Sequence, residues 1–211
     1  MARIFGYGED AFTLWALKNR KSDILKEFDD KTPPDCIVFY RPSFGRGDGA
    51  KFGEFDGIIV STENIYLIES KRDNFSKSEK DTINLEPCQE LRHSIFSWYL
   101  QHWDEEYTNR WESFERELGN NFQKNFKNRR IAPTGSLLAS NLEFVLIKLQ
   151  KHLGWIPAKQ DIKNVLLFFY DKDKSTSPVN VPTGFTPVSI DYGQEITGNF
   201  ISLEYLNEGK M

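Results

Sequence analysis

The sequence has little cysteine and no long apolar run. Its two cysteines, Cys36 and Cys88, are too few and too far apart for a disulfide framework or a cysteine zinc site. Every apolar run is shorter than the roughly 18 residues that a membrane span needs. The start also lacks the apolar segment of a secretory signal. We therefore expect no membrane partner and a cytoplasmic, intracellular protein.

Positive charge is also scarce in the chain as a whole. The net charge is -4 and the isoelectric point is near 5.5, which argues against a protein that only coats nucleic acid. Charge is uneven, however, because residues 104–118 are mostly acidic whereas the segment KNFKNRR at 124–130 is basic. That basic segment is most simply a solvated face, but its cations, interleaved with Phe122 and Phe126, would also suit a single strand of nucleic acid.

The sequence does contain enough apolar and aromatic residues for a core. Hydrophobic residues make up 39% of the 211 residues, aromatic residues 14% and charged residues 27%, which is the composition of a folded protein. This length favours a single domain over residues 1–211. The three histidines lack the tight spacing of zinc ligands.

Apolar periodicity predicts an α/β fold in which a central mixed β-sheet is flanked by helices. One or two short helices are expected at 9–28 and longer ones at 88–103 and 136–154, with strands at 36–40 and 164–170 and a β-hairpin at 55–71. Residues 104–130 are interpreted as exposed helix and connection, a helical insertion in this fold. From residue 171 onward, Pro, Gly, Ser and Thr predict short strands or loops.

Three charged residues interrupt the predicted hairpin, whose sequence is FDGIIVSTENIYLIESK. If a two-residue turn joins the strands, Ser61 pairs with Asn64, and the same register places Asp56 opposite Glu69. Lys71 lies on the face of Glu69, because side chains two apart in a strand share a face. That face continues through apolar side chains that should be covered, namely Ile58, Val60, Ile65 and Leu67.

Two directly opposed carboxylates repel each other unless a cation lies between them. Asp56 and Glu69, with a main-chain carbonyl, suit a hard divalent ion such as Mg²⁺ or Mn²⁺, which polarises a phosphate and lowers the pKa of bound water. The Lys71 ammonium would hold that water or stabilise the developing negative charge. These residues predict phosphodiester hydrolysis. The ordinary alternative is an exposed ion-pair hairpin that blunts a sheet edge, and a one-residue slip would move Glu69 to the other face.

Two segments, Phe55-Asp56-Gly57 and Ile68-Glu69-Ser70-Lys71, resemble the motif of the PD-(D/E)XK superfamily of restriction-endonuclease-like nucleases. The resemblance covers about residues 5–100 and the strand near 164–170, and it implies a restriction-endonuclease-like core of αβββαβ order. It also implies that Asp56 and Glu69 bind one or two Mg²⁺ ions, that the Ser70 carbonyl is a further ligand and that Lys71 assists the attacking water.

The same resemblance assigns two residues outside the hairpin. An acidic residue on the first helix often completes the metal site of this superfamily, and Glu9 is the match. Some branches add a Gln on the helix after the motif, for which Gln89 is the match. Glu9 also has an ordinary explanation as a first-turn acid that the helix dipole favours, and Gln89 as a solvated helix residue.

The expected function is therefore a metal-dependent nuclease that acts on DNA in restriction, repair or defence, with a homodimer as one way to cut both strands. A catalytically silent module that binds nucleic acid or serves assembly on the same fold is the alternative. A third interpretation makes Asp56 and Glu69 the acid and base of another hydrolase. Lys71 argues against it, because an ammonium lowers the pKa of a neighbouring carboxyl and so opposes a general acid.

Overall fold

The computed structural model describes residues 4–31, 36–44, 46–47, 50–51, 53–73, 83–127, 129–154, 161–173 and 180–203. Its elements follow one another in the order β1 (Phe5–Tyr7), α1 (Gly8–Asn19), α2 (Lys21–Lys26), β2 (Ile37–Tyr40), β3 (Arg46–Gly47), β4 (Ala50–Lys51), β5 (Gly57–Val60), β6 (Asn64–Arg72), α3 (Pro87–His102), the 3-10 helix η1 (Glu105–Tyr107), α4 (Trp111–Asn125), α5 (Leu137–Leu153), β7 (Asp161–Tyr170), β8 (Thr186–Asp191), β9 (Ile196–Thr197) and β10 (Phe200–Ser202).

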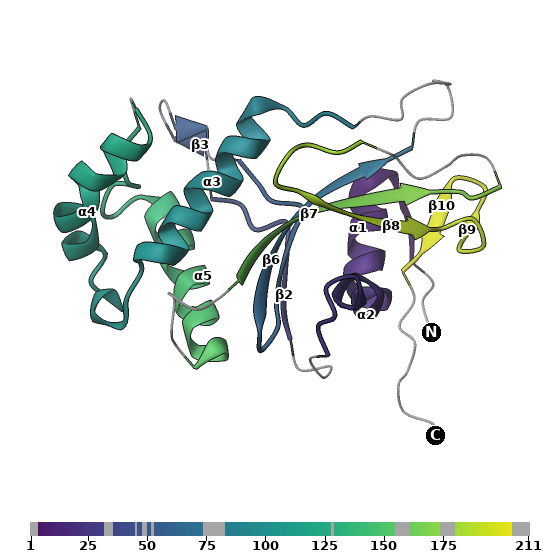
Figure 1. The fold of residues 1–211 in the computed structure, drawn as a ribbon, viewed down its shortest axis with the longest axis horizontal. Coiled ribbons are helices and arrows are strands. Elements are labelled where there is room, and N and C mark those ends of the chain that lie inside the picture. Colours follow the sequence, from purple (N-terminus) through teal and green to yellow (C-terminus); the bar gives the residue numbers. More distant parts are fainter. Residues whose placement is uncertain are drawn as a thin grey trace. The chain divides into compact units, whose positions relative to one another are not determined.

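The largest sheet is mixed and has five strands in the order β2-β5-β6-β7-β8 (Figure 1). Strand β2 pairs antiparallel with β5, with Ile37 opposite Val60, whereas β7 runs parallel to β8, with Val165 opposite Thr186. Strands β1, β10 and β9 form a smaller antiparallel sheet, and β3 pairs with β4. The predicted α/β class with a mixed sheet and helices is confirmed.

Two compact units divide the chain, and each contains part of β6 and part of β7. The first unit comprises residues 1–31, 68–84 and 165–211, and the second comprises residues 32–67 and 85–164. The expectation of a single domain over residues 1–211 stays a prediction.

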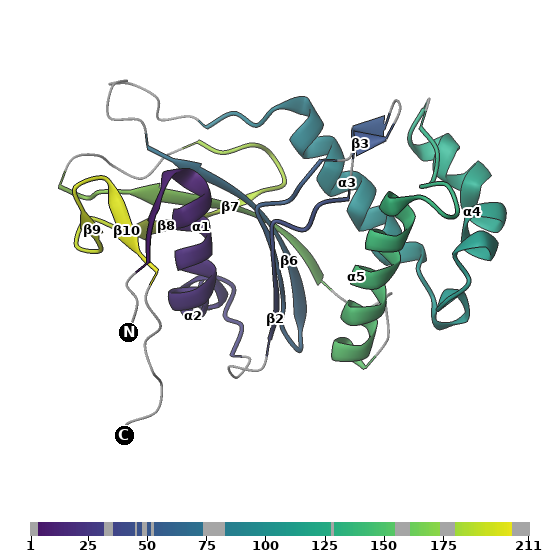
Figure 2. The same ribbon diagram turned by 180° about the vertical axis from the view of Figure 1, so that it is seen from behind.

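In the first unit, helix α1 packs on aromatic side chains. The ring of Phe12, which is fully buried, lies 4.7 Å from that of Tyr192 and 5.9 Å from that of Phe169, measured between ring centroids. Strand β10 contacts α1 and pairs antiparallel with β1, so segments far apart in the sequence lie side by side (Figure 2). The Leu203 N–H donates to the Ile4 carbonyl at 2.9 Å and extends this pairing by one more hydrogen bond.

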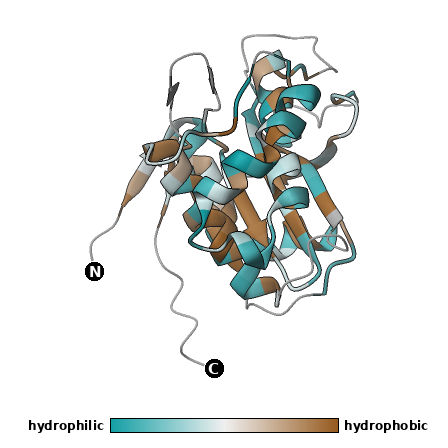
Figure 3. Ribbon diagram, turned by 90° about the vertical axis from the view of Figure 1, so that its left-hand side faces the viewer, coloured by the Kyte–Doolittle hydropathy of each residue, from teal (hydrophilic) through white to brown (hydrophobic). Residues whose placement is uncertain are grey.

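In the second unit, strand residues from the hairpin share one hydrophobic core with helices α3 and α5. Every second residue contributes, namely Ile58 and Val60 from β5 and Ile65 and Leu67 from β6, and each is at most 3% exposed. The strands carry long hydrophobic stretches in Figure 3, whereas hydrophilic and hydrophobic residues alternate along the helices. The predicted alternation and the covering of this apolar face are confirmed.

The turn of the hairpin depends on Ser61. Its backbone N–H donates to the Asn64 carbonyl at 3.0 Å, as the predicted register requires. The Ser61 hydroxyl oxygen accepts from the backbone N–H of Asn64 at 2.9 Å and from that of Glu63 at 3.1 Å. The Ser61 side chain therefore stabilises a turn whose central residues, Thr62 and Glu63, are a poor match to the favoured Asn-Gly pair.

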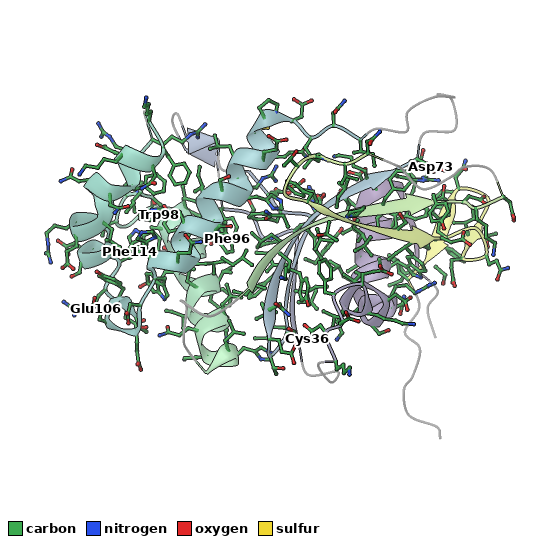
Figure 4. All side chains as sticks on the ribbon, in the orientation of Figure 1. Cys36, Asp73, Phe96, Trp98, Glu106 and Phe114 are labelled. Atoms are coloured by element: carbon green, nitrogen blue, oxygen red, sulfur yellow. The ribbon has the colours of Figure 1, made fainter. Side chains whose placement is uncertain are left out.

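The predicted helix within residues 104–130 is confirmed by α4, but the expectation that it is exposed is wrong for one side of the helix. Trp111, Phe114 and Phe122 are at most 6% exposed on that helix. The ring centroid of Phe122 lies 4.8 Å from that of Trp98 on α3, and that of Phe114 lies 6.0 Å from Trp98 (Figure 4). The many charged residues occupy the remaining positions of this amphipathic helix. The high overall charge of the segment therefore did not reveal that one side of the helix is buried.

The other predicted elements agree with the structure. Helices α1 and α2 share the region predicted for one or two short helices, and α5 ends before Gly154, which has the left-handed φ of 62° expected of a glycine stop. Both cysteines are free thiols. Within the described ranges, each helix is too short or too polar to cross a membrane.

Candidate active site

The start of helix α1 positions Glu9. Gly8, the first residue of the helix, has a φ of 81°, a conformation that L side chains rarely adopt. The Thr13 hydroxyl donates to the Glu9 carbonyl at 2.9 Å within the first turn. From this turn the Glu9 carboxylate reaches strand β6, where its Oε2 accepts the backbone N–H of Arg72 at 3.1 Å. Helix and strand are therefore joined at Glu9.

The end of strand β6 carries the other predicted residues of the first unit. Glu69 is 1% exposed and Ser70 is fully buried, whereas Lys71 is half-buried. Burial raises the pKa of Glu9, and the charges of Asp10 and Glu69 raise it further, while Lys71 and the Arg72 N–H act in the opposite direction. The structure thus brings Glu9, Glu69 and Lys71 within electrostatic reach of one another.

Arg72, which the sequence analysis did not single out, anchors this end of the strand. Its guanidinium lies 4.4 Å from the ring centroid of Phe12 and 5.2 Å from that of Tyr192. The Tyr192 hydroxyl donates to Asp73 Oδ1 at 2.9 Å, and burial, supported by the Asp73 carboxylate, raises the pKa of Tyr192 to about 12. The position of Arg72 directly after the motif could have drawn attention to it in the sequence. Its contacts could not be predicted, because its aromatic partners come from a distant helix and from the segment after β8.

Asp56 belongs to the second unit, directly before β5. It is half-buried, and its carbonyl oxygen accepts the Arg41 N–H at 3.3 Å. The preceding Phe55 is fully buried, with its ring centroid 4.9 Å from that of His93 and 5.4 Å from that of Phe96. The ring packing of Phe55 therefore anchors the backbone next to Asp56. The pairing of Asp56 with Glu69 and the metal-ligand role of the Ser70 carbonyl stay predictions.

Gln89 has a structural contact at the start of α3. Its Oε1 accepts the Glu86 N–H at 2.9 Å, which is one half of a capping box. This contact explains the residue without chemistry, and its catalytic role stays a prediction. On the same helix, His93 is 2% exposed, and its Nδ1 lies 2.8 Å from Asn164 Oδ1. This burial is that of a histidine packed in the second unit.

The residues of the first unit fit a hard divalent cation by their chemistry. Glu9 and Glu69 offer carboxylate oxygens, the ligands that Mg²⁺ and Mn²⁺ prefer. Burial is the main cause of the raised pKa of Glu9, and the Glu69 charge adds a smaller repulsion that such a cation would relieve. Across the part of the chain that the structure describes, His, Cys, Asp and Glu form no group of three or more that could hold a metal ion by themselves.

Comparisons with protein-family models, with curated proteins and with solved structures found no match to this chain.

Proposed function

We propose that this protein is a metal-dependent nuclease of the PD-(D/E)XK kind that hydrolyses phosphodiester bonds in DNA. The observation that carries the proposal is the hydrogen bond between Glu9 Oε2 and the Arg72 N–H. It joins the first helix to the end of the strand that carries Glu69 and Lys71, as a superfamily ligand from that helix requires. The order α1, β2, β5, β6, α3, β7 is compatible with the αβββαβ core.

The proposed ligands within the first unit are the carboxylates of Glu9 and Glu69, with the Ser70 carbonyl, while Asp56 stays the ligand that the resemblance implies. A bound Mg²⁺ or Mn²⁺ ion would polarise the phosphate and lower the pKa of a water ligand. The carboxylates make the site negative, and the packing that buries Glu69 keeps this ligand from bulk water. Lys71 donates to the attacking water or to a phosphate oxygen, and its ammonium offsets the negative charge that develops there.

Cleavage assays test the proposal with Glu69→Gln and Lys71→Ala. The purified variants are incubated with plasmid, linear duplex, single-stranded and branched DNA, in Mn²⁺ or in EDTA. We expect metal-dependent cleavage by the unchanged protein and a loss of about 100-fold or more in each variant, the size of effect that one electrostatic group has on a transition state. Glu27→Gln and Lys151→Ala, which remove the same charges at exposed positions, should cleave normally.

Thermal melting of all four variants verifies that each is folded. Cleavage by Glu69→Gln or Lys71→Ala at the unchanged rate would contradict the proposal, as would cleavage that persists in EDTA. Absence of cleavage on every substrate, with DNA binding retained, would favour the silent nucleic-acid-binding module instead.

A further inference from the structure

A pocket of about 560 Å³ lies at the C-terminal end of helix α4, and its lining is almost entirely cationic. The lining residues are Gln123, Lys127, Arg129 and Arg130. Each can donate hydrogen bonds to an anion, and the two guanidinium groups can do so in a bidentate manner. The pocket therefore suits an anion with several oxygen acceptors.

Nothing in the described part of the chain neutralises these cations. Among the described residues, Lys127, Arg129 and Arg130 form no ion pair through their side chains. The helix dipole accounts for a cation in the last turn of α4, where Lys124 lies. The dipole also favours Lys127, two residues beyond the end of the helix at Asn125, but it falls off too steeply to account for Arg129 and Arg130. Three adjacent uncompensated charges repel one another, which an anionic ligand would relieve.

The segment that carries the cations is anchored on both sides. Before it, the ring of Phe126 packs on that of Phe122 at 5.0 Å between centroids. After it, the Ala132 N–H donates to the Tyr99 hydroxyl oxygen at 3.2 Å, and the Ala132 carbonyl accepts the Trp111 indole N–H at 2.8 Å. Anchored flanks limit the entropy lost when the cations bind a ligand.

The aromatic residues of this region pack on the core and do not line the pocket. Phe122 is 2% exposed, and Phe126 packs against the hydrophobic core of the second unit. Stacking on a base requires an exposed ring face, which Phe122 does not offer and the half-buried Phe126 offers only in part. The alternative in which both aromatic residues bind bases of a single strand is therefore wrong for Phe122. What remains is contact with phosphates, which carries no sequence information.

We propose that the pocket formed by Gln123, Lys127, Arg129 and Arg130 binds the phosphate backbone of a nucleic acid without reading its bases. This inference goes beyond the proposed nuclease site, because it concerns other residues and the binding of nucleic acid, not its cleavage. It gives an acidic protein a local basic surface for a polyanion.

DNA binding by the full chain in EDTA, where metal-dependent cleavage is absent, tests this proposal. The triple variant Lys127→Gln, Arg129→Gln, Arg130→Gln is compared with a control, Lys26→Gln, Lys31→Gln, Lys151→Gln, which changes net charge equally at exposed positions. Fluorescence anisotropy is measured with two labelled duplexes of unrelated sequence over a salt series. For the pocket variant we expect at least a tenfold loss of affinity relative to the control. The slope of log affinity against log salt should fall by about 2 to 3, because each lost phosphate contact removes roughly 0.9 from it.

Equal affinity of the pocket variant and the control would overturn the proposal, as would a loss on only one of the two sequences or no DNA binding by the unchanged protein. Inorganic tripolyphosphate provides a second arm. If it binds the unchanged protein, fails to bind the pocket variant and leaves DNA affinity unaffected, the pocket serves a free polyphosphate and the proposal is wrong. Since none of these measurements involves cleavage, their failure is distinguishable from failure of the proposed nuclease activity.

Discussion

At the scale of single residues, Glu9 is the position where two explanations meet. A first-turn acid stabilises a helix through the dipole, and Asp10 beside it is exposed as such a residue should be. Glu9 differs because it is half-buried and accepts a hydrogen bond from another element. Burial and the Glu69 charge raise its pKa, so the fold holds this carboxylate at a cost to stability. Such a cost is usual for residues kept for function.

Replacement of Glu9 by Gln should stabilise the metal-free protein at neutral pH. The folded pKa of Glu9 is raised above its ordinary value of 4.5, so its contribution to stability is fully present below that pH and is lost as pH rises through the folded pKa. Gln is the neutral isostere and still accepts the Arg72 N–H, so it avoids this loss. Melting temperatures of variant and parent should diverge between pH 4 and pH 7.

Asp10→Asn is the matched control for this prediction, because it removes the same charge from the same helical turn at an exposed position. We expect it to leave the protein unchanged or slightly less stable at pH 7. A Glu9→Gln protein that melts lower than its parent at pH 7 would show that the carboxylate is a net stabilising group.

At the scale of elements, the position of Glu9 depends on how helix α1 begins. Gly8 has a φ of 81°, whereas Gly119 lies inside helix α4 with open space at its missing side chain. Gly8→Ala should therefore destabilise the protein by about 1 kcal/mol and weaken any activity that needs Glu9. Gly119→Ala should stabilise it by roughly 0.5 to 1 kcal/mol. Urea denaturation of both variants checks the two signs, and a stabilised Gly8→Ala protein would be inconsistent with the left-handed start.

The sequence predicted elements well where the signal was local and less well where partners were distant. Periodicity predicts helices α3 and α5 and the alternation in the hairpin. Turn geometry predicts the pairing of Ser61 with Asn64. Strands β9 and β10 are too short to show a period of two in the sequence. Strand β10 also pairs with β1, which is distant from it in the sequence. For α4, charged residues masked a narrow aromatic stripe. For the candidate site, Glu9 was predicted by resemblance, whereas the Arg72 contacts with Phe12 and Tyr192 depend on the tertiary fold.

At the scale of the whole molecule, binding of a divalent cation should be visible as stability. A ligand that binds only the folded chain stabilises it by about 2.7 kcal/mol at 100 times its dissociation constant. We expect Mn²⁺ to raise the melting temperature of the unchanged protein and to have little effect on Glu69→Gln. Calorimetric scans with Mn²⁺ and with EDTA check this, and Glu27→Gln serves as the control of equal charge. An equal rise in the Glu69 variant would place cation binding elsewhere.

The pairing of β1 with β10 has a consequence for the order of events during translation. Helix α1 contacts β10, and the Lys18 ammonium donates to the Leu203 carbonyl at 3.0 Å. At about 5 to 20 residues per second, the ribosome makes that last strand roughly 10 to 40 s after the helix. In a nascent chain, α1 therefore lacks its contacts with β10 and Leu203 until synthesis has passed residue 203. The helix that holds Glu9 gains its full packing only after β10 and Leu203 have been made.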